Sequence, residues 1–160
     1  MSSTPITVNS PRPFGDESTS GNYGRVAAWL SKRVEMALAL MDLTLPQYRV
    51  MGILAEGSAA ASGLADRLAV RPPSITAIID GLEARGLVDR KHDDVDRRRI
   101  AVRLTAEGKR VYEDADRSVN AHLSDIAACL PNKDETMALR SLQLWGEALT
   151  NFHHSRTDAP

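Results

Sequence analysis

Two groups of side chains in this sequence have the types and spacing needed to recognise duplex DNA. The first lies on a short predicted helix whose outward positions carry small groups, Ser74, Thr76 and Ala77. Hydroxyls of this size reach phosphates or base edges, and an Ala or Thr methyl group can touch a thymine methyl group. A solvent-facing helix of any small domain has the same pattern, so this helix alone leaves both interpretations open.

The second group is a run of charged residues that follows the helix, Asp96-Arg97-Arg98-Arg99. An arginine at the tip of a hairpin suits the narrow, electronegative minor groove of A·T-rich DNA. Asp96 can orient one of these arginines, although an exposed ion pair adds only about 0–1 kcal/mol to stability. In isolation such a run is usually a solvated turn, but its place directly after a helix-turn-helix favours a DNA contact.

Apolar periodicity predicts the helix-turn-helix that positions the first group. Ser62 is expected to cap its first helix, residues 69–71 form the turn, and the second helix runs from Pro73 to Arg85. Gly86 is the residue type that ends a helix in the left-handed conformation. The apolar positions expected in the core are Leu64, Ala65 and Leu68 in the first helix and Ile75, Ile78, Ile79 and Leu82 in the second.

The apolar period changes from helical to two after residue 86, which predicts a β-hairpin wing. Val88 and Arg90 form one short strand, residues 91–98 form a charged loop, and Ile100, Val102 and Leu104 define the second strand. Residues 43–105 are therefore predicted to form a winged helix-turn-helix domain.

Helices are predicted on both sides of this domain. A stripe from Tyr23 ends before residue 42, and a capping box at Thr44 with Gln47 begins a helix that ends near Glu56. Thr105 caps a helix over 106–130, Pro131 and Asn132 break it, and a last helix starts near Asp134. The fold class is mainly α with a small β-hairpin wing. Residues 23–42 and 106–154 form a helical dimerisation region, and residues 1–22 form a flexible tail.

Composition narrows the function classes. The chain has 160 residues, 42% hydrophobic and 26% charged, which suits one globular domain with helical additions. A net charge of −1 argues against a sequence-blind polycation. Basic charge is local instead, because seven Lys or Arg and four Asp between residues 85 and 103 leave an excess of +3.

Several other classes are disfavoured by what the sequence contains. No signal-peptide pattern and no apolar run of membrane-spanning length occur, so we expect a cytoplasmic protein without a membrane partner. We expect no enzyme and no cofactor, since no glycine-rich phosphate loop, nucleophile elbow or HExxH motif is present. No metal site is expected either, and both His122 and Cys129 fall on an apolar stripe, which favours a satisfied core histidine and an inert buried thiol.

The sequence from residue 64 to residue 108 resembles that of the MarR family of bacterial regulators. The resemblance is carried by Leu64-Ala-Asp-Arg-Leu-Ala-Val70, by Pro73-Ser-Ile-Thr-Ala-Ile-Ile-Asp-Gly-Leu-Glu-Ala-Arg-Gly-Leu-Val88, and by Asp93-Asp-Val-Asp-Arg-Arg-Arg followed by Ile100-Ala-Val-Arg-Leu-Thr-Ala-Glu-Gly108. It covers residues 25–152 in the order of elements and is most specific over 64–108.

The resemblance implies a homodimer whose first and last helices interlock, with the helix from Pro73 to Arg85 reading a pseudo-palindromic operator in double-stranded DNA. Asp96 and Arg98 match the family's wing motif, which implies that Asp96 orients Arg98 into the minor groove. Arg97 would then contact the DNA backbone. Ser74 and Thr76 match positions that commonly touch DNA, and Arg71, Ala77 and the turn belong to the same surface. Many relatives have a long polar residue in place of Ala77. We therefore expect fewer direct contacts between side chains and base edges in this protein.

The family often binds a small aromatic or anionic effector between the dimerisation helices and the wing domain. Trp29, Met36, Tyr48 and Met51 could line such a pocket, although ordinary core packing explains the same spacing. The sequence therefore predicts a DNA-binding transcriptional regulator, a repressor relieved by a small molecule. The alternative is a winged-helix module that binds protein without DNA, against which the wing-tip charges argue.

Overall fold

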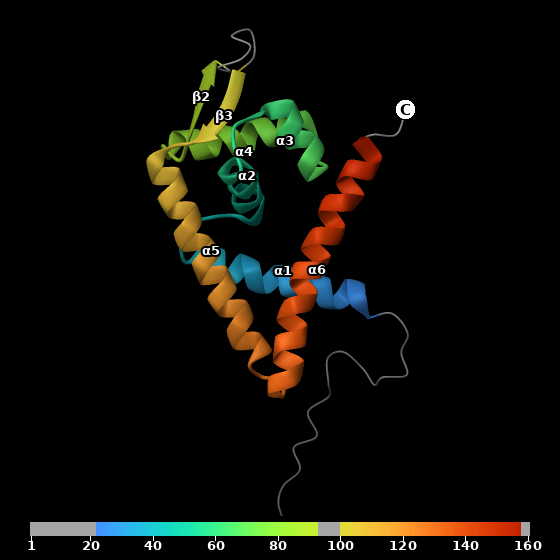
Figure 1. The fold of residues 1–160 in the computed structure, drawn as a ribbon. Coiled ribbons are helices and arrows are strands. Elements are labelled where there is room, and N and C mark those ends of the chain that lie inside the picture. Colours follow the sequence, from blue (N-terminus) through green and yellow to red (C-terminus); the bar gives the residue numbers. More distant parts are fainter. Residues whose placement is uncertain (1–21, 93–99, 158–160) are drawn as a thin grey trace, which may run out of the picture.

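The chain is helical apart from one small sheet. The computed structural model describes residues 22–92 and 100–157. Figure 1 shows the helix-turn-helix and the wing strands at one end, with α5 running from them to the opposite end, where the chain turns back into α6. The predicted fold class is confirmed. The elements are α1 (Tyr23–Ala39), α2 (Leu45–Ala55), β1 (Ala59–Ala60), α3 (Ala61–Leu68), α4 (Pro72–Ala84), β2 (Val88–His92), β3 (Ile100–Leu104), α5 (Ala106–Ala127) and α6 (Asn132–Thr157).

The sheet has three antiparallel strands in the order β1-β3-β2, one strand more than the predicted hairpin. In the hairpin, Val88 pairs with Leu104 and His92 with Ile100, so the first strand is longer than predicted. The additional strand β1 pairs Ala59 with Val102. Two alanines carry no strand signal of their own. They pair because the link between α2 and α3 passes along the open edge of β3.

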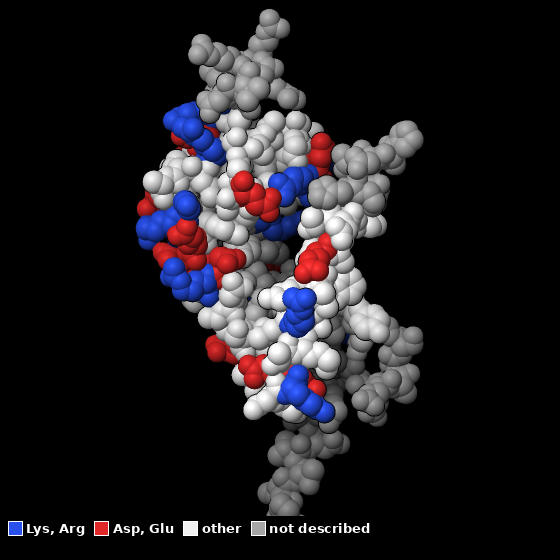
Figure 2. Space-filling model, in the orientation of Figure 1, with Lys and Arg blue, Asp and Glu red and all other residues white. Residues whose placement is uncertain are grey.

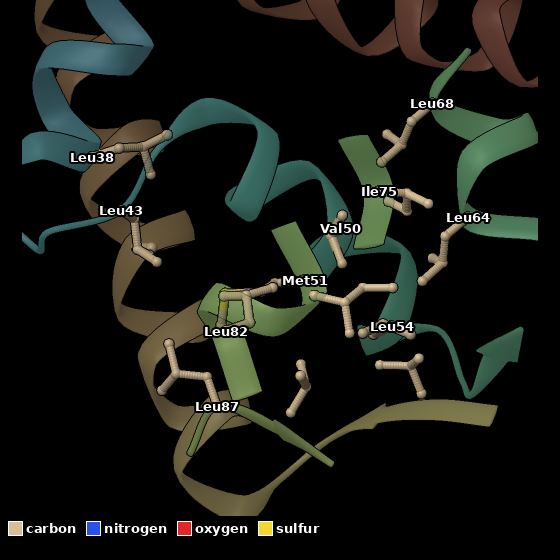
Figure 3. Close-up of a cluster of buried hydrophobic side chains, with 14 of the residues drawn as sticks. Leu38, Leu43, Val50, Met51, Leu54, Leu64, Leu68, Ile75, Leu82 and Leu87 are labelled. Carbon is tan, nitrogen blue, oxygen red and sulfur yellow. The ribbon is translucent and has the colours of Figure 1, made fainter. Parts of the chain in front are cut away.

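The core is built mainly from α2, α3, α4 and the sheet, and α1 and α5 also contribute buried side chains (Figure 3). Figure 3 labels Met51, Leu54 and Leu82 within this cluster of buried side chains. Helix α2 contacts α1, α3, α4, α5 and β3, so it is surrounded by the other elements of this half of the molecule. The largest fully buried side chains are Leu38, Val50, Met51, Leu64, Ile75, Ile79, Leu82, Val88 and Val102.

Most predicted helix ends are confirmed. The side chain of Thr44 accepts from the Gln47 amide while the Gln47 side chain accepts from the Thr44 amide, which is the predicted capping box. Thr105 caps α5 through the Gly108 amide, and Gly86 adopts φ 69° after α4. The prediction for Ser62 is wrong, because α3 begins at Ala61 directly from β1 and has no side-chain cap. The strand, which the sequence did not indicate, sets that helix start.

The region around the α5–α6 turn differs from the prediction in three ways. Helix α6 starts at Asn132 rather than near Asp134, since the Pro131 carbonyl already accepts from the amides of Asp134 and Glu135. Cys129 is exposed rather than buried, because α5 ends two residues earlier. His122 is half-buried, but its Nε2 has no hydrogen-bond partner among the described residues.

No helix within residues 22–92 and 100–157 combines the length and the apolar character needed to cross a membrane.

The start of α5 approaches the end of α4 so closely that it requires glycine. A Cβ atom on Gly108 would lie 1.8 Å from the Leu87 carbonyl oxygen. The Thr105 amide donates to that oxygen at 3.1 Å and its hydroxyl donates to the Gly86 carbonyl at 2.7 Å, so the backbone there cannot move freely.

Gly108→Ala should therefore lower the free energy of unfolding by about 3 kcal/mol, since backbone has to shift to relieve the overlap. Urea unfolding followed by circular dichroism measures this loss. Gly63→Ala on α3 is the matched control, because a Cβ atom there meets nothing within 4 Å. It should stabilise the helix by roughly 0.5–1 kcal/mol. Equal effects of the two substitutions would contradict the proposed close approach.

Candidate nucleic-acid interface

Helix α4 has one buried and one exposed face, as predicted. Ile75, Ile79 and Leu82 are 0–1% exposed and hold the helix on the core. Ser74, Thr76 and Ala77 are all exposed, so the structure brings the three predicted contact positions together on one outward surface. Short side chains leave the helix slim enough to approach the floor of the major groove.

The beginning of α4 constrains which of its groups can bind phosphate. Pro72 and Pro73 have no amide hydrogen, and the amides of Ser74 and Ile75 both donate to the Arg71 carbonyl, at 2.9 and 3.2 Å. Backbone amides of a helix N-terminus are the usual phosphate ligands. Here they are already used or missing, so the exposed side chains of Arg71 and Ser74 remain for that contact.

Of the two groups that the sequence suggested for Thr76, a hydroxyl and a methyl group, the structure already engages the hydroxyl. This hydroxyl donates to the Pro72 carbonyl at 3.1 Å within the helix. The hydroxyl hydrogen is therefore engaged, and the side chain offers a methyl group and an acceptor lone pair to a ligand. Thr76 and Ala77 together form a small apolar surface of the kind that fits a thymine methyl group.

Asp96, Arg97 and Arg98 lie outside the described residues. The strands that lead to them are held by the β2–β3 ladder, up to the pair of His92 with Ile100. On one face of this ladder Arg103 donates to the directly opposite Asp89 at 2.9 Å, and Lys91 lies 3.5 Å from the same carboxylate. Figure 2 shows the same mixture of signs on the side that carries α5 and the wing strands, where basic and acidic side chains adjoin one another.

Two arginines that sequence reasoning did not assign tie α4 to its surroundings. Arg85 donates to the backbone carbonyl of Asp42 at 2.5 Å and so links the end of α4 to the α1–α2 turn, where Asp42 itself has φ 53°. Arg90 on β2 contacts both Asp80 and Glu83 of α4. The spacing of Asp80 and Glu83 by one helical turn was the available signal for the second contact.

A polar cluster joins α2 to α5. The Tyr48 hydroxyl donates to Asp116 at 2.6 Å, the Asn120 amide donates to the other oxygen of that carboxylate at 2.9 Å, and the ring of Tyr48 stacks on Tyr112 with centroids 5.6 Å apart. Burial raises the pKa of Tyr48 above its ordinary value of 10.0, and the hydrogen bond to Asp116 and that residue's charge raise it further. Burial likewise raises the pKa of Tyr112, helped by the charges of Asp116 and Glu56.

The four predicted pocket residues are not equivalent. Trp29 and Met36 lie on α1 and are 50% and 49% exposed. Tyr48 is half-buried between α2 and α5. Met51 has no exposed surface and belongs to the core, so its assignment to a pocket does not hold for this structure. In the described part of the chain, no three His, Cys, Asp or Glu side chains converge where a metal ion could be held.

The helix-turn-helix of α3 and α4 followed directly by the β2–β3 hairpin defines a winged helix-turn-helix protein. A family model described as the MarR family matches residues 41–99. The regulator FarR of Neisseria gonorrhoeae is 32% identical over 133 residues, which cover 81% of this chain and 90% of FarR.

Solved structures agree with these matches. The structure of CouR from Rhodococcus jostii RHA1 bound to p-coumaroyl-CoA has a TM-score of 0.63 and 30% identity, and the match covers 75% of this chain and 85% of that one. A Mycobacterium tuberculosis MarR family protein in complex with p-aminosalicylic acid has a TM-score of 0.64 and 26% identity, covering 78% and 95%. The chain belongs to the MarR family. It is a DNA-binding transcriptional regulator, and the alternative of a protein-binding module is not favoured.

The Tyr48 cluster should make the free energy of unfolding fall at alkaline pH. Because the folded-state pKa values of Tyr48 and Tyr112 lie above the unfolded value of about 10, the folded chain holds these protons more tightly. The free energy of unfolding should then decrease as the pH rises past 10. Between pH 9 and pH 11 we expect wild type to lose about 1 kcal/mol more than Tyr48→Phe, allowing for partial exposure.

Urea titrations at both pH values measure this difference. At neutral pH, Tyr48→Phe should cost about 1 kcal/mol for the lost hydrogen bond. Tyr23→Phe, at a position that is 80% exposed, is the matched control and should follow the wild-type curve. Parallel curves for wild type and Tyr48→Phe would show that the cluster does not hold the proton.

Proposed function

We propose that the chain acts in the cytoplasm as a homodimeric repressor that is released from its operator by a small aromatic or anionic effector. The observation that carries the proposal is the exposed, small-residue face of α4 beside a hairpin whose tip sequence is rich in arginine. That pairing suits a helix in the major groove with a wing in the adjacent minor groove.

In this proposal Arg71 and Ser74 bind the DNA backbone, and Thr76 and Ala77 touch bases. Asp96 orients Arg98 in the minor groove, and Arg97 contacts a phosphate. The base-facing groups on α4 are short and mostly apolar, so little hydrogen-bonded readout is available to them. Specificity then depends largely on groove width and DNA deformability, which proteins read without contacting base edges.

Exposed apolar surface on the terminal helices supports a dimer. Every residue from Leu142 to Phe152 of α6 is exposed, and Ser141, Leu144, Trp145 and Ala148 line a shallow, mainly apolar hollow. Apolar patches of this kind on a soluble domain usually mark an interface. Large exposed apolar side chains of α1 and α6 include Tyr23, Val26, Trp29, Met36, Met137, Leu142, Leu144, Trp145, Leu149 and Phe152.

A two-fold dimer dictates the form of the operator. Each protomer would place one α4 in the major groove, so the site should be a pseudo-palindrome whose half-sites lie one helical turn apart, about 10–10.5 base pairs.

Aromatic and thioether side chains close to the winged helix-turn-helix domain support the proposal that an effector binds there. Trp29 and Met36 offer aromatic and thioether groups on α1, and Tyr48 lies at the α2–α5 contact. Ligands in the names of two structural relatives, p-coumaroyl-CoA and p-aminosalicylic acid, are aromatic compounds with acidic groups. A ligand that binds near Tyr48 would act on the junction between the DNA-binding domain and α5. That location would let binding shift the orientation of α4.

Arg98→Ala should weaken binding to a duplex from upstream of the protein's own gene by about 1–3 kcal/mol per half-site and flatten the salt dependence, because one cationic contact is lost. Mobility shifts across a salt series measure both effects. Arg117→Ala removes a charge from α5 and should bind like wild type. Unchanged binding by Arg98→Ala would refute the wing assignment. If the wild-type protein binds no duplex at low salt, the DNA proposal is refuted and the protein-binding module becomes the favoured interpretation.

Trp145→Glu should convert the dimer to a monomer in sedimentation velocity, because it places a charge in the apolar surface of α6. Operator affinity should fall with it, since the two half-sites are no longer bound by one particle. Ile100→Glu, at a wing position that is 56% exposed, is the matched control and should sediment like wild type. A wild type that sediments as a monomer would overturn the dimer.

A further inference from the structure

The helix that we propose to enter the major groove carries the wrong charge for that task. Its only ionisable side chains between Pro72 and Ala84 are two carboxylates, Asp80 and Glu83. Asp80 and Glu83 are one turn apart and have side chains 57% and 39% exposed. In a helix bound in the major groove, the DNA phosphates would repel these carboxylates, and water would screen the repulsion only in part.

Arg90 meets both carboxylates at once. It belongs to β2, two residues after the buried Val88, so the pleat places it on the face of the strand that is turned toward α4. One guanidinium nitrogen lies 2.5 Å from Asp80, and the other contacts Glu83. The side chain of Arg90 is 32% exposed, the least of the three, so its charge is directed at α4 rather than at solvent.

We propose that Arg90 is a positioning residue for DNA binding, which neutralises the two carboxylates of α4 and does not itself contact DNA. The inference rests on the function proposed above. Arg90 belongs to the basic region that the sequence indicated, yet both terminal nitrogens of its guanidinium group already donate to carboxylates, one to Glu83 and the other to Asp80. The planar fork of arginine suits this task, because it can satisfy two carboxylates spaced by one helical turn.

The test is a double-mutant cycle on DNA affinity. The variants are Arg90→Gln, which keeps the aliphatic stem, the double substitution Asp80→Asn with Glu83→Gln, and the triple combination. Fluorescence anisotropy with the full-length protein measures the dissociation constant on the upstream duplex and on a random duplex, each at several salt concentrations. Circular dichroism melts verify that each variant is folded, and Arg90→Lys, which keeps the charge, is measured beside them as the conservative variant.

If Arg90 neutralises Asp80 and Glu83, the variants should change DNA affinity in a specific pattern. Arg90→Gln should weaken binding at least tenfold on both duplexes, most strongly at low salt, because it exposes two carboxylates to the phosphates. The double substitution alone should bind as tightly as wild type or tighter. In its background Arg90→Gln should change affinity less than twofold. Arg90→Lys should retain most of the wild-type affinity.

Three results would overturn the proposal in distinguishable ways. An equal loss from Arg90→Gln in both backgrounds would make Arg90 a direct phosphate contact. A loss from the double substitution as large as that from Arg90→Gln would make the ion pairs a structural support for the wing. Failure of wild type to bind either duplex would instead remove the proposed function itself.

Arg103→Gln is the matched control. Arg103 lies on the neighbouring strand β3 and pairs with Asp89, not with a carboxylate of α4. Its substitution should have the same effect in the wild-type and the Asp80→Asn, Glu83→Gln backgrounds. Coupling of Arg103 equal to that of Arg90 would show that the cycle reports general charge and would refute a specific role for Arg90.

Discussion

The burial of α2 is the constraint on which the rest of the structure depends. Val50 and Met51 have no exposed surface, Leu54 is 4% exposed, and α1, α3, α4, α5 and β3 all pack against this one helix. A short helix that is apolar on most sides has to be enclosed, and the elements that enclose it acquire fixed positions relative to one another. Because α4 is one of them, its outward face is set by what its inward face covers.

The same enclosure connects the DNA-binding domain to the long helices. Tyr48, on the half-buried side of α2, reaches Asp116 of α5, and Arg85 at the end of α4 reaches the turn that joins α1 to α2. The Tyr48–Asp116 hydrogen bond is partly buried, where a hydrogen bond is electrostatically stronger than in water, whereas the Arg85 contact is exposed. The Tyr48–Asp116 contact therefore adds a specific polar interaction to the apolar packing that fixes α2 against α5.

Charge distribution explains how a chain with a net charge of −1 can bind DNA. On the described wing strands Arg90, Lys91 and Arg103 are all paired with carboxylates, so the basic excess counted along the sequence overstates the cations that are available there. These ion pairs leave few cationic side chains free to contact DNA phosphates. A regulator that must dissociate from most DNA sequences needs such weak non-specific binding. Local arrangement therefore decides DNA affinity more than the total charge does.

The sequence by itself determined the helices, the turn of the helix-turn-helix, the wing hairpin and the exposed face of α4, because these depend on periodicity, caps and Gly86, which are local. It also carried the family resemblance. It did not show β1, whose two alanines become a strand only beside β3, or the start of α3 that follows from it. Tertiary structure alone decided that Met51 is core and that Tyr48 binds Asp116. Each of these depends on which distant elements meet, and a one-dimensional pattern holds no information about the partner.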